Sequence, residues 1–197
     1  MAFNVDQFRS ALVADGARPN LFQVRLSFPF LFPSGTNGSI TSQYGTSQTL
    51  SFLANSTQLP ASTVGVARQN YFGREIKFPG NRTFQPWSIN VINDESFDLR
   101  NNFEYWLNMI NDSNLNIRNQ SATTSLDYAV NATVLQFSKT GDVIKEYDFV
   151  GLFPTQVDPI NLNWGSNDQI EEFGVTFEYQ YWNSNTTSNN LIQPRAI

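Results

Sequence analysis

Residues 151–182 read GLFPTQVDPINLNWGSNDQIEEFGVTFEYQYW, and this stretch decides the fold class. Its second half places apolar side chains at every other position, at Phe173, Val175, Phe177, Tyr179 and Tyr181. This alternation is typical of an antiparallel strand that buries one face and exposes the other. Leu162 and Trp164 alternate with asparagines earlier in the stretch, and residues 165–168, GSND, favour a turn. The stretch therefore predicts two strands joined as a β-hairpin.

The composition restricts the chemistry open to the chain. It has 197 residues, enough for one domain with a core, and 17 Phe help to bring the aromatic content to 14%. It has no Cys and no His, which excludes disulfides, thiol nucleophiles, zinc chemistry and a Ser-His-Asp triad. The net charge of −5 argues against a surface that binds nucleic acid tightly. Residues 1–20 contain no long apolar run, so we expect no membrane span there.

The alternating pattern recurs along the chain and predicts further strands. They are expected at residues 20–28, 49–53, 68–78, 83–92, 128–137 and 143–150. Residues 139–142, KTGD, predict a hairpin turn between the last two strands. Pro79-Gly80 predicts another turn, with Ile76 and Phe78 pointing inward just before it.

Two segments have helical spacing. Residues 5–14 predict a short N-terminal helix, and residues 93–96, NDES, open the one substantial helix. That helix carries a single apolar stripe, which we expect to be core, at Leu99, Phe103, Trp106, Leu107 and Ile110. Many strands with one long helix indicate a mainly β protein, an antiparallel β-sandwich or barrel with one flanking α-helix.

We expect a single domain over residues 1–182, an extended loop over residues 29–47 within it, and a polar tail over residues 183–197. The loop is rich in Gly, Ser and Thr, yet it begins with a cluster of apolar residues. These apolar residues pack either in the core or on a neighbouring subunit. The residues predicted to form an inter-subunit contact are Phe30, Leu31, Phe32, Gly35 and Tyr44.

The sequence offers no catalytic constellation. Asp94, Glu95 and Asp98 could bind Mg²⁺ or Ca²⁺ or act as an acid/base pair, but their position at a helix start is explained by the helix dipole and capping. Glu171 and Glu172 are adjacent in a predicted strand and therefore point to opposite faces. We expect no enzyme activity, no cofactor and no metal.

A carbohydrate-binding sandwich is an alternative, because an Asn- and Ser-rich surface with exposed rings would suit sugars. Against it, the tryptophans occupy positions expected to be core or interface, namely Trp87, Trp106, Trp164 and Trp182.

An ordered set of short motifs resembles the tail tube protein of contractile-tailed bacteriophages. The first half of the chain contributes residues 17–24 (ARPNLFQV), Leu59-Pro60, residues 80–84 (GNRTF) and Trp87. The helix contributes Asn93, Asp94, Glu95, Asp98, Arg100, Phe103 and Trp106. The closing stretch contributes Gly151-Leu152, Pro154-Thr155, Val157, Leu162, Trp164, Ser166-Asn167, Ile170-Glu171, Phe173 and Trp182. The loop over residues 29–47 and the tail after Trp182 depart from the family pattern.

The resemblance implies a β-sandwich or barrel related to the haemolysin-coregulated protein of type VI secretion. It also implies a virion protein, assembled in the host cytoplasm, whose hexameric rings stack into a tail tube for genome ejection. The implied partners are other copies of the chain, the sheath protein, the tape-measure protein, and the baseplate and tail-terminator proteins. Double-stranded DNA would pass through without tight binding. The tube of a phage-like secretion or injection system remains a second possibility under the same resemblance.

Overall fold

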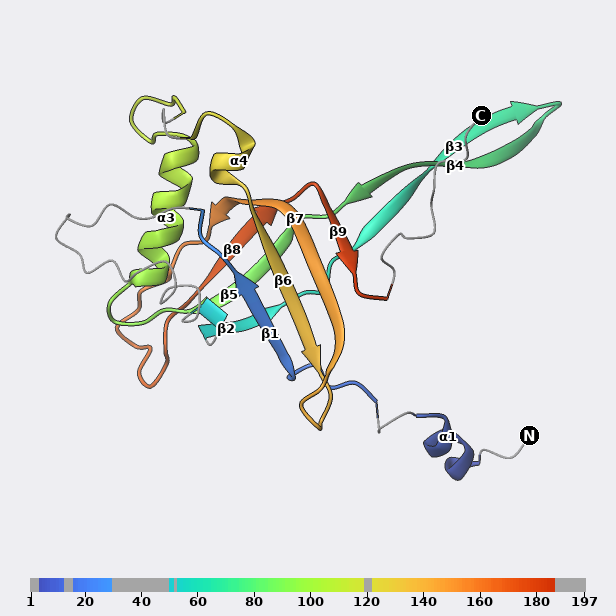
Figure 1. Cartoon of the computed structure of the whole chain (residues 1–197), viewed down its shortest axis with the longest axis horizontal. Helices are drawn as coiled ribbons and strands as arrows, with labels where there is room; N and C mark the ends of the chain where they lie inside the picture. The colour runs from blue at the N-terminus through green and yellow to red at the C-terminus, as the bar shows by residue number, and fades with distance from the viewer. Residues whose placement is uncertain (1–3, 13–15, 30–49, 52, 119–121, 187–197) are drawn as a thin grey trace.

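The computed structural model describes residues 4–12, 16–29, 50–51, 53–118 and 122–186. Strands dominate these ranges (Figure 1). The strands are β1 (Phe22–Leu26), β2 (Ala54–Thr57), β3 (Ser62–Tyr71), β4 (Arg74–Phe84), β5 (Trp87–Ile92), β6 (Val130–Phe137), β7 (Val143–Val157), β8 (Glu172–Glu178) and β9 (Tyr181–Ser184). The helices are α1 (Val5–Ala11), α3 (Asp98–Ile110) and α4 (Ser125–Tyr128).

Seven strands form one folded sheet in the order β1-β6-β7-β8-β5-β2, with β9 also paired to β7. Every pairing in it is antiparallel. The first half of β7 pairs with β6 and β9, and its second half pairs with β8. The 15-residue β7 therefore belongs to two layers that face each other, and within the described ranges the sheet does not close into a barrel. The predicted mainly β, sandwich-like fold with one flanking helix is confirmed.

The change of layer occurs at Gly151. Val150 pairs with Tyr181 of β9, whereas Phe153 pairs with Glu178 of β8. Gly151 has a φ of 67°, in the left-handed region that glycine reaches without steric cost. A Cβ at this position would also lie 2.9 Å from Cγ of Gln180. A glycine thus bends the longest strand so that both layers share it.

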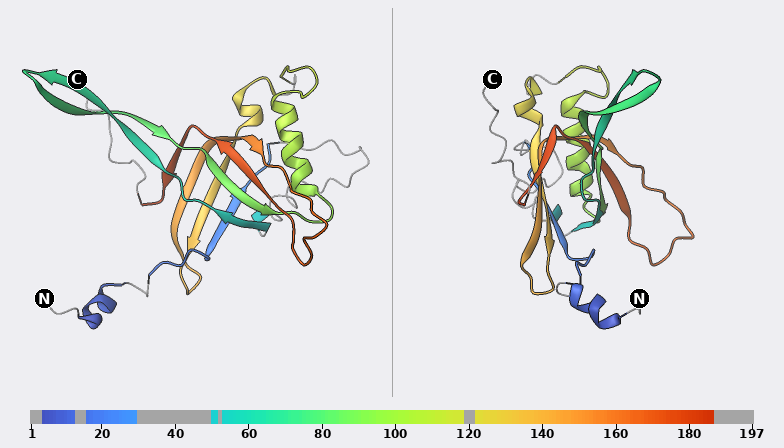
Figure 2. Two further views of the ribbon diagram at one scale, coloured as in Figure 1. Left: turned by 180° about the vertical axis from the view of Figure 1, so that it is seen from behind. Right: turned by 90° about the vertical axis from the view of Figure 1, so that its right-hand side faces the viewer.

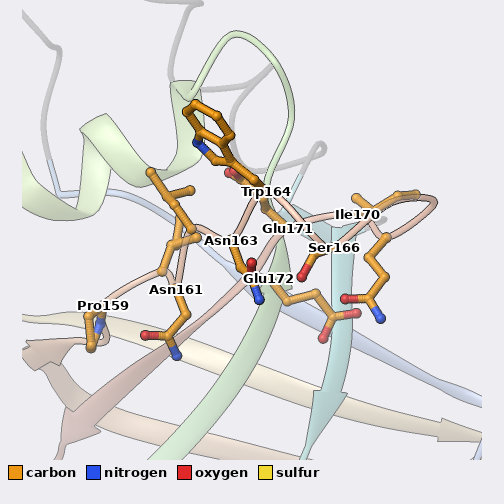
Figure 3. Close-up of a pocket in the computed structure, with 11 residues that line it drawn as sticks. Pro159, Asn161, Asn163, Trp164, Ser166, Ile170, Glu171 and Glu172 are labelled. Carbon is orange, nitrogen blue, oxygen red and sulfur yellow. The ribbon is translucent and has the colours of Figure 1, made fainter.

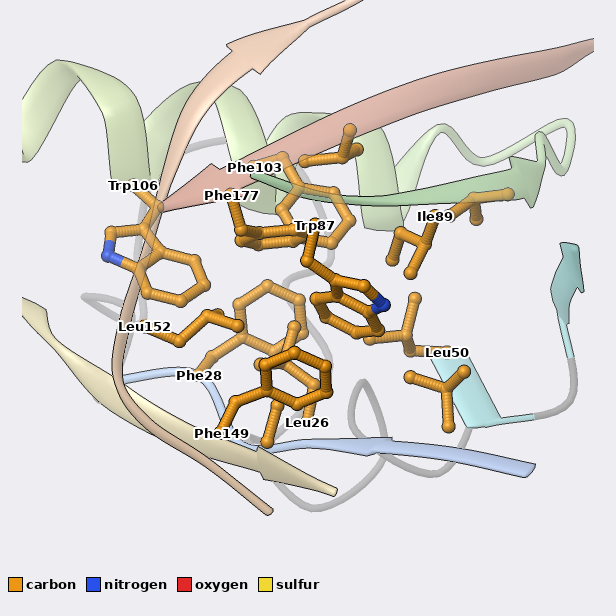
Figure 4. Close-up of a cluster of buried hydrophobic side chains, with 14 of the residues drawn as sticks. Leu26, Phe28, Leu50, Trp87, Ile89, Phe103, Trp106, Phe149, Leu152 and Phe177 are labelled. Carbon is orange, nitrogen blue, oxygen red and sulfur yellow. The ribbon is translucent and has the colours of Figure 1, made fainter. Parts of the chain in front are cut away.

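The core fills the space between the two layers and α3 (Figure 4). Trp87 of one layer stacks on Phe149 of the other with ring centroids 4.5 Å apart. Phe103 of α3 meets Phe173 and Phe177 edge-on, at 6.4 and 5.9 Å. Contacts between these rings bury a large apolar area. They hold α3 against the open side of the sandwich.

The predicted stripe on α3 divides into two groups. Leu99, Phe103 and Trp106 are at most 1% exposed. Leu107 and Ile110 are only partly buried, and Met109 is buried at 4% exposure. The reason is the 100° step of the helix, which turns Leu107 away from the line through Leu99, Phe103 and Trp106.

The predicted strand around Leu162 and Trp164 is wrong. Residues 158–171 form a loop, in which Leu162 is 80% exposed and Trp164 is fully exposed, so Trp164 is not a core residue. The physical reason is that β7 already runs to Val157, and Pro159 has no N–H to continue the ladder. The hairpin itself exists, but it joins β7 to β8 through this longer loop.

The predicted turn at Pro79-Gly80 is also wrong. Both residues lie inside β4, and the chain instead reverses at Phe72 and Gly73, whose φ values of 49° and 78° suit a two-residue hairpin turn. Pro79 is accommodated next to a shift in register between Val64 and Val66. The bulge interrupts the ladder at this point, so the missing N–H of proline is tolerated.

Ile76 and Phe78, predicted to point inward, are 40% and 53% exposed. The β3–β4 hairpin leaves the body of the domain (Figures 1 and 2), so the body offers these side chains no surface to pack against. An alternating pattern identifies a strand face, but it does not show that another layer covers that face.

Three smaller corrections concern element limits. Residues 50, 51 and 53 are helical where a strand was predicted, and Leu50 is buried in the core. Tyr128 ends α4 and does not begin β6. The strand predicted to continue to Trp182 breaks after Glu178, which leaves Tyr181 45% exposed on β9.

Candidate assembly surface

The β3–β4 hairpin is an arm that extends from one end of the layer containing β5 and β8 (Figure 1). Two buried aromatic residues anchor its base. Trp87 Nε1 donates to the carbonyl of Gln58, in the segment that joins β2 to β3, at 2.9 Å. Tyr179 Oη donates to the carbonyl of Gln85, just after β4, at 2.9 Å. Burial, assisted by the charge of Glu178, raises the pKa of Tyr179.

The two faces of this arm differ in chemistry. Cross-strand partners share a face, so Ala67 lies beside Phe78, Gln69 beside Ile76 and Tyr71 beside Arg74, on a face that is mostly apolar. The opposite face carries Arg68, Lys77 and Glu75, whose carboxylate lies 3.4 Å from Arg68 and 3.9 Å from Lys77. The ion pairs are exposed and contribute little stability, so the uncovered apolar face is the more informative feature.

The tip of the arm presents an aromatic residue to solvent. Phe72 is 91% exposed and has a left-handed backbone, which is uncommon for a bulky residue. Its ring meets that of Tyr71 edge-on, with centroids 4.5 Å apart. The turn thus projects a pair of rings beyond the end of the strands.

The loop over residues 158–171 leaves the other end of the same layer (Figure 2). Asp158 anchors it, because its N–H bonds to the carbonyl of Gly174 at 2.8 Å and its own carbonyl accepts from Arg100 Nη1 at 3.1 Å. The loop encloses a pocket of about 440 Å³, which Figure 3 shows with side chains from both of its limbs. The apolar lining residues are Pro159, Ile160, Leu162, Trp164 and Ile170.

The remaining unpaired backbone lies on the sheet edges. β1 and β2 end the strand order and β9 pairs with β7 alone, so each of these strands has one neighbour among the described strands. An open edge is a row of N–H and C=O groups that can pair with another chain. The edges face sideways from the strands, whereas the arm and the loop lie at the strand ends.

The acidic residues do not converge on one site. Asp94 accepts from Ser96 Oγ at 2.7 Å, and Ser96 Oγ accepts from the N–H of Asp98 at 3.4 Å, so these residues organise the start of α3. Glu171 accepts from Asn93, while Glu172 accepts from Asn55 and Asn90. The part of the chain that the structure describes holds no group of three or more acidic residues able to bind a metal ion.

The residues predicted to form the inter-subunit loop lie outside the described residues, so Phe30, Leu31, Phe32, Gly35 and Tyr44 stay predictions. No helix in the described ranges is both long and apolar enough to cross a membrane. Sequence reasoning missed the arm as a candidate site, although the signal was present. Two strand-like runs of ten and eleven residues flank Phe72-Gly73, and a glycine at a turn between such runs indicates a hairpin.

A strand-rich subunit with open sheet edges, a projecting arm and exposed rings belongs to the class of proteins that complete their surfaces against other copies of themselves. The family model described as phage tail tube protein matches residues 17–185, and the chain belongs to this family. It is a structural protein of the virion, located in the tail tube.

Named relatives of this chain are tail tube proteins. The tail tube protein gp19 of Enterobacteria phage T4 is 32% identical over 178 residues, which cover 90% of this chain and 97% of that protein. The tail tube protein of Serratia phage KSP90 is 26% identical over 177 residues, covering 89% and 93% of the two chains.

Solved structures show the same fold. A chain in the 6-fold symmetrised cryo-EM structure of the anti-feeding prophage baseplate gives a TM-score of 0.57 at 13% identity, covering 85% of this chain and 94% of that chain. A chain in the sheath-tube complex of an extracellular contractile injection system in its extended state gives 0.51 at 16% identity, with coverage of 93% and 98%.

Proposed function

We propose that this chain assembles into hexameric rings that stack into the inner tube of a contractile tail, the conduit for genome ejection. Membership of the tail tube family is the observation that carries the proposal. The open edges of β1 and β2 support ring formation, because antiparallel pairing with neighbours would remove both edges. The 6-fold symmetry of an assembly with a similarly folded chain supports the ring of six.

The proposed partners are the sheath, baseplate and tail-terminator proteins. Support comes from similarly folded chains, which occur in a sheath-tube complex, a sheath/tube terminator and a baseplate. We extend the proposal to a tape-measure protein inside the tube before ejection. The segment over residues 29–47 is proposed to contact a neighbouring subunit.

Double-stranded DNA is proposed to pass without tight binding. The net charge of −5 supports this, because a wall that attracted phosphate would hold DNA where it has to slide. The role is structural, with no catalytic step assigned to any residue.

A tube for a phage-like injection device is the second candidate. The fold shared with a chain of the anti-feeding prophage favours it, since that fold serves particles other than phages. Against the carbohydrate-binding alternative, Trp87 and Trp106 are buried and Trp182 is partly buried against the core, which leaves Trp164 as the one exposed tryptophan that could stack on a sugar.

Negative-stain electron microscopy of the purified full chain tests the proposal. We expect rings of six subunits at moderate concentration and tubes at high concentration. Monomeric particles in every salt and concentration tested would overturn it. A glycan array on the same preparation would then test sugar binding.

A further inference from the structure

The N-terminal helix α1 exposes an apolar stripe. Val5, Phe8 and Leu12 are 68%, 66% and 42% exposed. Their spacing of three and four residues places them on one side of the helix. None of the residues of α1 is buried against the part of the chain that the structure describes, and the helix lies apart from the body of the domain (Figures 1 and 2).

A helix as short as α1 needs a partner. It has seven residues, and isolated helices shorter than about 12–15 residues are marginal in water. The side chain of Asn4 caps its start by accepting from the N–H of Asp6 at 3.0 Å. One cap does not offset the cost of forming so short a helix, so its stability has to come from packing of the apolar stripe.

One row of residues crosses the layer that contains β1, β6, β7 and β9. Phe22 and Lys145 both pair with Gln136. The register of β9 against β7 places Thr186 opposite Lys145, and Lys145 Nζ donates to Thr186 Oγ1. Phe22 and Thr186 are therefore three strand spacings apart, which is about 14 Å.

Both ends of the chain leave the sheet close to this row and on the same side. Each neighbouring pair of strands in the layer is antiparallel, so the start of β1 and the end of β9 lie at the same end of the layer. The N–H of Asn185 still bonds to the carbonyl of Glu146 at 3.2 Å, which keeps the chain on this course beyond β9. Figure 1 shows α1 beyond the same end.

The C-terminal segment, residues 187–197, is long enough to reach α1. It lies outside the described residues, and its sequence TSNNLIQPRAI contains the apolar residues Leu191, Ile192 and Ile197. An extended chain from Thr186 reaches up to about 18 Å at Leu191 and about 40 Å at Ile197. The ten residues between α1 and β1 reach up to about 36 Å. Both distances exceed the width of the row, so the two segments can meet.

The other apolar segment outside the described residues starts from the wrong place. Residues 30–49 follow Phe28, which is buried in the core, and β1 separates Phe28 from the row at Phe22. They therefore leave from the opposite end of the layer.

Charge also favours the C-terminal segment. Arg195 is the only charged residue in residues 187–197, and Asp6 is the only carboxylate of α1. Residues 1–16 and 186–197 both lie outside the residues that match the family model, so that match assigns no role to either segment.

We propose that residues 191–197 dock on the apolar stripe of α1 in the same copy and form a terminal clasp. The clasp joins the start of β1 to the end of β9, the two outer strands of this layer. It orders α1 and holds both outer strands at one end of the layer. The inference goes beyond the tube function and does not depend on it, because the contact forms within one subunit.

Hydrogen exchange of the full chain, followed by mass spectrometry below the concentration at which rings form, tests the clasp. The variant Leu191→Asp/Ile192→Asp removes two adjacent apolar side chains from the C-terminal segment. We expect the amides of residues 5–12 to exchange about tenfold faster in this variant, because exchange follows the fraction of time for which the helix is open. The matched control, Asn189→Asp/Asn190→Asp, adds the same charges without removing apolar surface and should exchange like the parent.

The outcomes separate the clasp from its alternatives. Equal exchange of α1 in the parent and in the apolar variant would overturn the proposal. Equal acceleration in the control would also overturn it, since charge alone would then explain the effect. Protection that disappears on further dilution would show that the segment comes from another copy, against a clasp within one subunit. Absence of tubes at high concentration would overturn the tube function and leave the clasp intact, while loss of the clasp leaves the tube function intact.

Trypsin tests the same contact from the other side. A docked segment shields the bond after Arg195, and cleavage there releases residues 196–197, which intact mass detects. Phe8→Asp should speed this cleavage about tenfold, because it removes the ring in the middle of the stripe. Gln7→Asp adds the same charge away from the stripe, near the start of α1 where a carboxylate is tolerated, and should leave the rate unchanged. Equal rates in Phe8→Asp and in the parent would overturn the docking.

Discussion

At the scale of single residues, Trp106 links the helix to both the core and the backbone. Its ring lies 5.8 Å from that of Phe28, and its Nε1 donates to the carbonyl of Tyr128 at 2.8 Å. It is 1% exposed, so almost its whole surface is removed from water. The side chain therefore holds α3 against the sandwich and fixes the segment that leads into β6.

We predict that Trp106→Ala lowers the free energy of unfolding by roughly 3–5 kcal/mol, the usual loss for a large aromatic residue deleted from a core. Denaturant titration followed by circular dichroism measures it. Trp106→Phe should recover most of the loss, since it keeps a ring and gives up one hydrogen bond worth about 1 kcal/mol. Leu107→Ala, on the next and less buried position, is the control and should cost less. A melt of Trp106→Ala that matches the parent would place this part of α3 outside the core.

At the scale of elements, β7 is the strand on which both layers depend. It pairs with β6 over residues 143–152, with β9 over residues 147–150 and with β8 from Phe153 onward. A straight strand of this length would carry its second half away from the core. The bend at Gly151 is what lets Phe149 and Leu152, both fully buried, face the same interior.

We predict that Gly151→Ala destabilises the fold by about 1–2 kcal/mol from backbone strain alone, because an L-residue is disfavoured at this φ. The new Cβ also meets Gln180 Cγ at 2.9 Å, which adds a steric cost. Gly141→Ala provides a control, since Gly141 has a φ of 90° and open space around its Cα. Differential scanning calorimetry should rank Gly151→Ala below Gly141→Ala. Adding Gln180→Ala should recover part of the difference; no recovery would show that the steric contact is unimportant.

At the scale of the whole molecule, the arm and the loop differ in charge and both expose apolar side chains. The arm is basic and the loop is acidic, although the chain as a whole is acidic. Both projections expose large apolar side chains, at Val66, Tyr71, Phe72 and Phe78 on the arm and at Leu162, Trp164 and Ile170 on the loop. Exposed apolar patches of this kind mark interaction surfaces.

We predict that assembled tubes bind double-stranded DNA only weakly at physiological salt. A net charge of −5 per subunit provides few phosphate contacts, and phosphate contacts supply most non-specific affinity. Fluorescence anisotropy with a labelled duplex, on tubes confirmed by microscopy, measures this affinity. Binding that is tight and weakens steeply with salt would contradict the conduit mechanism even with tubes present. A basic DNA-binding protein in the same buffer serves as the positive control.

The sequence by itself determined the strand faces and the one long helix. Phe173, Val175 and Phe177 are buried as their alternation predicts, because the side chains of a strand point to opposite faces whatever lies nearby. The helical stripe through Leu99, Phe103 and Trp106 follows from the 3.6-residue period in the same way. Both periodicities depend only on residues close together in the sequence, so they can be read without knowing the tertiary structure.

Only the tertiary structure decided which of these faces are covered. Phe78 alternates as Phe177 does, yet Phe78 is 53% exposed and Phe177 is fully buried, because β4 leaves the body while β8 lies against α3 and the opposite layer. Trp87 is likewise buried and Trp164 fully exposed, because other segments of the fold pack around Trp87 and not around Trp164. Burial depends on contacts between segments far apart in the chain, and these contacts leave the arm and the loop exposed.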